Sequence, residues 1–111
     1  MNRYEFAFNF VNKLNELGNA PNFELFDNTA NNDDFCIRAN VVGYSMRVDI
    51  GNDVGILSIR GSEDFDDLLV RIAESVGFKH SSARRLSLES DSDLILARRF
   101  DTMVKIISAL A

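Results

Sequence analysis

His80 and Cys36 are the residues whose types most directly support catalysis or metal binding, and the chain has one of each. A histidine can act as a general base near neutral pH, and a thiolate is a nucleophile and a metal ligand. His80 lies in a polar stretch after Phe78-Lys79, which is typical of a surface residue. Cys36 alternates with apolar positions in a strand-like run and has no nearby His to activate it, which favours a structural thiol. Zinc requires three or four N or S ligands and the chain has two candidates in all, so we expect no metal site.

Acidic residues gather in two segments, and neither has the pattern of a strong cation site. Residues 27–34 look like a calcium loop, but the sixth position lacks glycine and Arg38 stands where the bidentate Glu belongs. Glu89, Asp91 and Asp93 crowd one turn, which we interpret as solvated rather than as a loose cation site. The chain also lacks a glycine-rich phosphate loop and a dinucleotide-binding fingerprint. We therefore predict that it is not an enzyme and has no cofactor.

Four arginines form the one concentrated positive charge in the sequence: Arg84, Arg85, Arg98 and Arg99. In the hairpin predicted below, Arg84 would lie opposite Arg98, so all four would cluster at its open end. Two interpretations stay open. In the first, acids of the preceding helix such as Asp66 neutralise the cluster. In the second, the cluster contacts an anion, an acidic partner segment or nucleic acid.

Size and charge restrict the class of protein. The chain has 111 residues, enough for one domain over residues 1–111, and 46% of them are apolar. A net charge of −5 works against nucleic acids and anionic membranes, and it suits a basic or neutral partner, or simply aids solubility. One cysteine cannot form an internal disulfide, and we find neither a signal peptide nor an apolar run of about 20 residues. We expect a cytoplasmic protein without a membrane segment.

The first predicted element is an amphipathic helix between Asn2 and Gly18. Asn2 is a suitable cap with Glu5 three residues on, and Gly18 supplies the stop. Apolar residues recur between them at helical spacing. Tyr4 and Phe8 widen this face, so either the fold buries both rings or they form an exposed shoulder for a partner.

Three strands are predicted next, because apolar residues alternate with polar ones over 35–41, 44–50 and 54–60. Gly43 and the segment 51–53 provide the turns, and such short connections indicate an antiparallel meander. Before them, Phe23 to Phe26 form either an edge strand or a loop.

The second helix is predicted from a cap at Ser62 or Asp64 to a stop at Gly77, with Phe78 placed for the contact that follows a glycine cap. Its apolar residues follow the helical period: Phe65, Leu68, Leu69, Ile72, Ala73 and Val76.

A hairpin and a final helix are predicted for the C-terminal third. Leucines flank the turn 90–92 so that Leu88 would pair with Leu94 and Leu86 with Leu96. Asp101 would then cap a last helix of about ten residues. The alternative is one long helix from Asp93, since Leu96 and the apolar residues after it also fit helical spacing.

Class I type III secretion chaperones, the Tir chaperone family, have the element order helix, three strands, helix, two strands, helix. The chain resembles this family in element order, length and acidic balance. The segment Leu94-Ile95-Leu96-Ala97-Arg98-Arg99-Phe100 looks like the family's last strand running into its final helix. The YbjN-like family shares the topology. One departure is the final helix, which is predicted to be shorter here than is usual in the family.

The resemblance implies a homodimer that keeps the N-terminal segment of a secreted effector extended. The dimer contact would fall on the second helix, at Phe65, Leu69, Ile72 and Val76. The partner's apolar side chains would lie in grooves between the first helix and the sheet, near Phe6, Phe10, Tyr44 and Met46. We therefore expect a non-enzymatic α+β protein-binding domain of the secretion-chaperone type. The alternative is another interaction, inhibitor or regulatory domain of this topology, YbjN-like or immunity-type.

Overall fold

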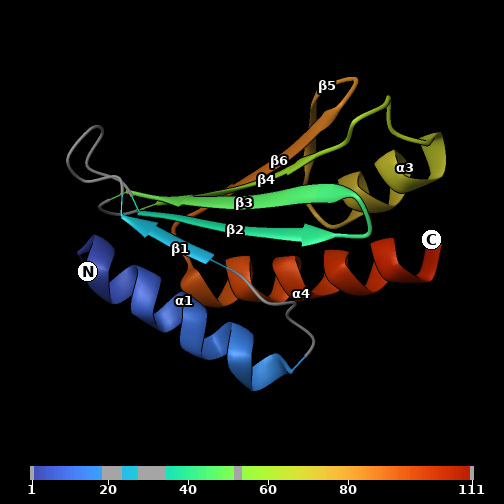
Figure 1. Ribbon diagram of the computed structural model, residues 1–111. Coiled ribbons are helices and arrows are strands. Elements are labelled where there is room, and N and C mark those ends of the chain that lie inside the picture. Colours follow the sequence, from blue (N-terminus) through green and yellow to red (C-terminus); the bar gives the residue numbers. More distant parts are fainter. Residues whose placement is uncertain (1, 19–23, 28–34, 52–53, 111) are drawn as a thin grey trace.

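The computed structural model describes residues 2–18, 35–51 and 54–110, and the backbone of residues 24–27. This part of the chain contains three helices and six strands in an α+β order (Figure 1). In chain order they are α1 (Arg3–Leu17), β1 (Glu24–Asp27), β2 (Phe35–Val41), β3 (Tyr44–Ile50), β4 (Gly55–Arg60), α3 (Asp67–Ser75), β5 (Lys79–Ser82), β6 (Arg85–Ser90) and α4 (Asp93–Leu110). The predicted order of helix, meander, helix, hairpin and helix is confirmed, and residues 24–27 form an edge strand.

The strands form one sheet in the order β1-β2-β3-β4-β6-β5, and every neighbouring pair is antiparallel. β2, β3 and β4 are the predicted meander. After β4 the chain passes through α3 and β5, and β6 then returns between β4 and β5. Because paired residues share a face, Leu57 opposite both Val48 and Leu88 lies on the apolar side.

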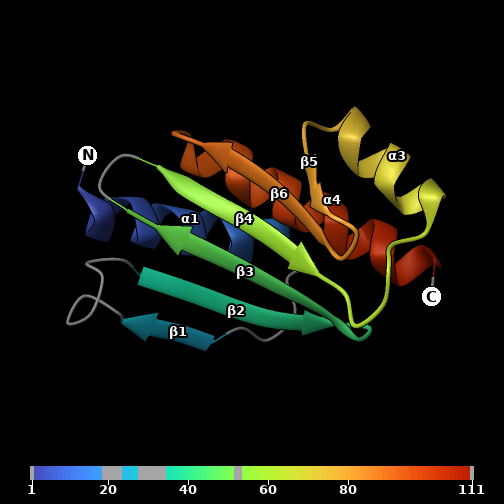
Figure 2. The same ribbon diagram turned by 90° about the horizontal axis from the view of Figure 1, so that it is seen from above.

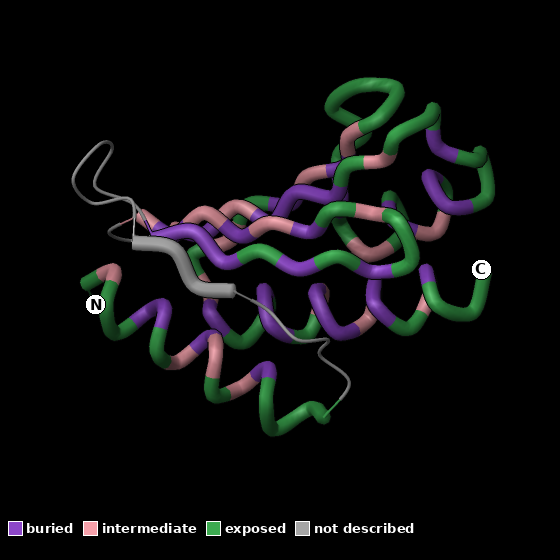
Figure 3. Tube along the Cα trace, in the orientation of Figure 1, coloured by how far each residue is buried: buried purple, intermediate pink, exposed green. Residues whose placement is uncertain are grey.

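Helices α1 and α4 cover one face of the sheet, and none of the helices that the structure describes lies over the other face (Figures 1 and 2). The core lies between these two layers, where buried residues of both helices face the strands (Figure 3). Phe10 of α1 and Phe100 of α4 meet edge to face with their ring centroids 6.1 Å apart. The helices come so close to β4 that a Cβ atom on Gly55 would lie 2.4 Å from Leu96 Cδ1.

The ends of α1 and α3 follow from local side chains. Asn2 Oδ1 accepts a hydrogen bond from the Glu5 N–H at 3.0 Å, and Gly18 ends α1 with a φ of 75°. Both were predicted. After α3, Gly77 has a φ of 100°, and the N–H of Phe78 donates to the Ala73 carbonyl at 3.0 Å. This is the expected glycine-type cap, and buried Phe78 completes it.

Asp66 caps α3, and the prediction of Ser62 or Asp64 is corrected. Asp66 Oδ1 accepts a hydrogen bond from the Leu68 N–H at 2.8 Å, so the helix begins at Asp67. Residues 62–65 instead form the connection from β4.

The predicted pairing of 86–88 with 94–96 is wrong, because β6 pairs with β4 and β5 while residues 93–110 form one helix. Leu86 and Leu88 lie opposite Ile59 and Leu57, so they already have strand partners. Ser92 caps α4 by accepting a hydrogen bond from the Ile95 N–H at 3.2 Å. Asp101, predicted as a cap, is buried in the middle of this 18-residue helix and pairs with Lys105 at 3.1 Å.

Candidate functional site

His80 and Cys36 do not form a catalytic pair. Cys36 is fully buried in β2 and His80 is exposed on the edge strand β5, with β3, β4 and β6 between them. The His80 ring lies 6.4 Å from that of Phe65, a contact between rings rather than with a second catalytic group. The two side chains therefore do not act on one another.

The acidic segments do not gather into a metal site in the part of the chain that the structure describes. Asp93 pairs with Lys13 of α1 at 3.0 Å, which fixes the start of α4 against α1. Glu89 lies on β6 and Asp91 in the turn after it, and both are exposed. Asp27 ends β1, and the rest of the calcium-like segment, residues 28–34, lies outside the described residues.

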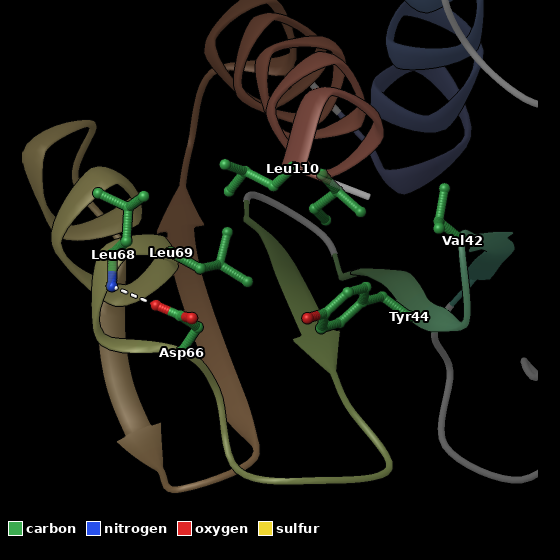
Figure 4. A pocket seen from close by; sticks show the side chains of 7 residues that line it. Val42, Tyr44, Asp66, Leu68, Leu69 and Leu110 are labelled. Carbon is green, nitrogen blue, oxygen red and sulfur yellow. Dashed lines mark hydrogen bonds between the residues drawn. The ribbon is translucent and has the colours of Figure 1, made fainter.

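The structure instead shows an apolar groove at the end of the sheet where β3 begins. It has a volume of about 290 Å³. The β2–β3 turn, the start of α3 and the end of α4 line it, with side chains directed at the hollow from different elements (Figure 4). The lining residues are Val42, Tyr44, Asp66, Leu68, Leu69, Ile107 and Leu110.

Large apolar side chains remain accessible around this groove. Val42 is 55% exposed, Leu68 53% and Leu110 49%. Tyr44 stacks on Phe65 with ring centroids 5.7 Å apart, which holds the ring at the wall of the groove. Exposed apolar residues from three separate elements therefore meet at one hollow, which is the usual property of an interaction surface.

Val42 also has an unusual backbone conformation. It forms a two-residue turn with Gly43, and their φ angles are 50° and 84°. Positive φ at both central residues is typical of a type I′ turn, for which Asn-Gly is the preferred sequence. A β-branched residue there is strained, and such strain is concentrated at functional sites. The turn thus holds an apolar side chain at the groove at some cost in stability.

The residues predicted for partner binding and dimerisation lie mostly in the core. Phe6, Phe10 and Met46 are fully or almost fully buried because α1 lies directly on the sheet. Only Tyr44 of that set reaches the candidate site.

The predicted dimer contact on α3 is divided between core and surface. Phe65 and Leu69 are buried within the chain's own core. Ile72 and Val76 are half-buried on the flank of α3 and its C-cap.

The exposed-shoulder interpretation of α1 fits the structure, since Tyr4 is 57% and Phe8 67% exposed. Tyr4 makes an edge contact with Phe35 at 4.9 Å and a cation–π contact with Arg3. The predicted burial of these two rings is wrong.

The four arginines do not form one cluster, because the hairpin that would have joined them does not form. Arg84 and Arg85 lie at the β5–β6 turn, whereas exposed Arg98 and half-buried Arg99 lie on α4, which covers the other face of the sheet. Arg84 pairs with Asp64 at 3.2 Å, and Arg85 donates a hydrogen bond to Ser58 at 3.1 Å.

Comparison with known proteins finds no matching family model, no matching curated protein and no matching solved structure. Among the described residues, no helix combines the length and the apolar character needed to cross a bilayer.

Sequence reasoning missed the groove because Leu68 and Leu110 fit the apolar periodicity of their helices and were assigned to the core-facing stripe. One signal was present in the sequence. The segment Val41-Val42-Gly43-Tyr44 puts valine at the turn position where Asn or Asp is the common residue.

Proposed function

We propose that this chain is a non-enzymatic protein-binding domain that holds apolar side chains of a partner in the groove between α3, α4 and the β2–β3 turn. The observation that carries the proposal is the exposure of Val42, Leu68 and Leu110 around one hollow. These side chains come from three elements, and no described segment covers them.

The size and lining of the groove suit a side chain better than a small-molecule substrate. Its volume of about 290 Å³ is at the lower limit of ligand pockets, which range over about 300–1,000 Å³. Asp66 is the one titratable carboxyl group in the lining, and its Oδ1 already accepts a hydrogen bond from the Leu68 N–H. General acid–base chemistry requires a group free to exchange protons with a substrate, and the groove offers no such pair.

We further propose, from the resemblance to secretion chaperones, that the partner is the extended N-terminal segment of a secreted effector bound in the cytoplasm. An extended segment places alternate side chains on one side, so single apolar anchors can enter the groove while the backbone stays outside. The proposal includes a homodimer through the flank of α3, at half-buried Ile72 and Val76.

Peptide binding tests the groove. The probes are fluorescein-labelled 13-residue peptides of equal charge, one set with Leu at alternate positions and one with Ser instead. The variant Leu68→Asn/Leu110→Asn should bind the Leu peptides roughly 10- to 30-fold more weakly than the wild type, because two half-exposed apolar contacts are removed. The matched control is Leu94→Asn/Ile95→Asn, which removes two exposed apolar residues at the other end of α4.

The control variant should bind the Leu peptides as the wild type does. The Ser peptides should bind neither the wild type nor the variants. Equal losses in both double variants, or equal binding of Leu and Ser peptides, would contradict the groove proposal. Light scattering at micromolar concentration tests the dimer separately, and a monomer there would exclude the dimer without affecting the peptide result.

A further inference from the structure

The face of the sheet opposite α1 and α4 carries a band of positive charge on a chain whose net charge is −5. One basic residue from each of five neighbouring strands contributes to this basic band: Arg38 of β2, Arg47 of β3, Arg60 of β4, Arg85 of β6 and Lys79 of β5. Five of the chain's twelve basic residues thus lie on one face.

The strand register places these residues side by side. Arg60 lies opposite Arg85, and Arg47 lies opposite Arg38. Lys79 lies opposite Ser87, which continues the row of Arg47 through Ser58. Directly opposed residues share a face, so the two rows form one surface across the strands. Glu24 of the edge strand β1 lies opposite Arg38 in the register, at the β2 end of the band. The acidic residues Asp49 and Glu89 lie in the next row along.

Some basic residues of the band form ion pairs with neighbouring carboxylates, and others do not. Arg47 binds Asp49, with its Nη2 2.7 Å from Oδ1, and this hydrogen bonding raises the pKa of the Arg47 guanidinium above its ordinary value. Exposed Arg60 and Lys79 have no ion-pair partner among the described residues. The uncompensated charge is therefore concentrated over β4, β5 and β6.

A polar hollow of about 350 Å³ adjoins this part of the band, lined by Arg60, Gly61, Ser81, Ser82, Arg84 and Arg85. Asp64 already places a carboxylate on Arg84 there, at 3.2 Å. That ion pair is solvent-exposed, with side-chain exposures of 62% and 72%, and such pairs exchange readily for another acid. The site can thus hold carboxylates, and its own carboxylate is easily displaced.

We propose that the basic band binds an acidic segment of a partner protein. The band spans five strands, about 19 Å at the usual strand spacing, which matches about six residues of extended chain. A single-stranded nucleic acid fits less well, because the band residues include no aromatic ring on which bases could stack. This surface is on the face of the sheet opposite α1 and α4, and the inference does not depend on the apolar groove.

The test uses fluorescence anisotropy with a labelled decapeptide of alternating Glu and Ser. Its comparison probes are the same peptide with Gln for Glu, and a thymidine hexanucleotide of equal charge. The variant Arg60→Gln/Lys79→Gln should weaken binding of the Glu peptide about tenfold in 50 mM salt. The matched control Arg71→Gln/Arg98→Gln changes the net charge equally at exposed positions of α3 and α4, and it should bind within twofold of the wild type.

The groove variant Leu68→Asn/Leu110→Asn should bind the Glu peptide as the wild type does, so failure of one surface does not imply failure of the other. The peptide should also bind more weakly in 200 mM salt. The proposal is overturned if the Glu peptide does not bind, or if the Gln peptide binds equally well. It is also overturned if Arg60→Gln/Lys79→Gln and Arg71→Gln/Arg98→Gln lose affinity for the Glu peptide equally, or if the hexanucleotide binds more tightly than the Glu peptide. Circular dichroism of each variant confirms that it is folded.

Discussion

Replacing Val42 with Asn should make the fold more stable, although it removes an apolar side chain. Val42 is the first central residue of the β2–β3 turn and has a φ of 50°. Valine is disfavoured there because its branched Cβ crowds the backbone in the left-handed region, whereas Asn occupies that region readily and precedes Gly in type I′ turns.

The magnitude follows from two opposing contributions. A left-handed backbone costs an ordinary residue about 1–2 kcal/mol, most of which Asn recovers. The lost contacts are small because Val42 is more than half exposed. We expect a net gain of about 1 kcal/mol, which for a domain of this size corresponds to a rise in Tm of about 4 °C.

Urea and thermal unfolding followed by circular dichroism measure this gain. Val42→Thr is the control, because threonine keeps the branched Cβ and should leave the free energy of unfolding within about 0.5 kcal/mol of the wild type. If Val42→Asn is no more stable than the wild type, or if Val42→Thr gains equally, the strain argument is refuted. The stabilised variant should at the same time bind the Leu peptides more weakly, since Val42 lines the groove.

Three further substitutions test the packing. Gly55→Ala should lose about 1–2 kcal/mol in urea unfolding, because the new Cβ would lie 2.4 Å from Leu96 Cδ1; unchanged stability would mean that the helices pack less closely on β4. Leu69→Ala should lower the free energy of unfolding by about 2–4 kcal/mol and Leu68→Ala by under about 1 kcal/mol, since only Leu69 is buried. Equal losses in chemical denaturation would contradict the assignment of Leu69 to the core and Leu68 to the surface. Phe100→Ala should cost about 3–5 kcal/mol and lower the Tm, because the ring is fully buried against α1.

Much of the fold was predictable because its signals are local. Asn2 and Gly18 delimit α1, and Gly77 with Phe78 ends α3, through hydrogen bonds within a few residues. The strands of the meander follow from alternation and short turns in the same way. Two elements were not predicted correctly: no strand was expected at Lys79–Ser82, which form β5, and the start of α4 was assigned to a strand. Leu94 and Leu96 fit both a strand and a helix, and the choice depended on β4 already pairing with Leu86 and Leu88, a contact that local periodicity does not contain.

The amino-acid sequence by itself determined the α+β order, the helix ends of α1, and the shortage of residues suited to catalysis. It did not determine which apolar residues stay exposed, because periodicity identifies an apolar face without showing how much of that face a neighbour covers. Only the tertiary structure brought Val42, Leu68 and Leu110 together at one groove. Only the strand register aligned five separate cations on one face, because residues far apart in the chain become neighbours solely through pairing across the sheet.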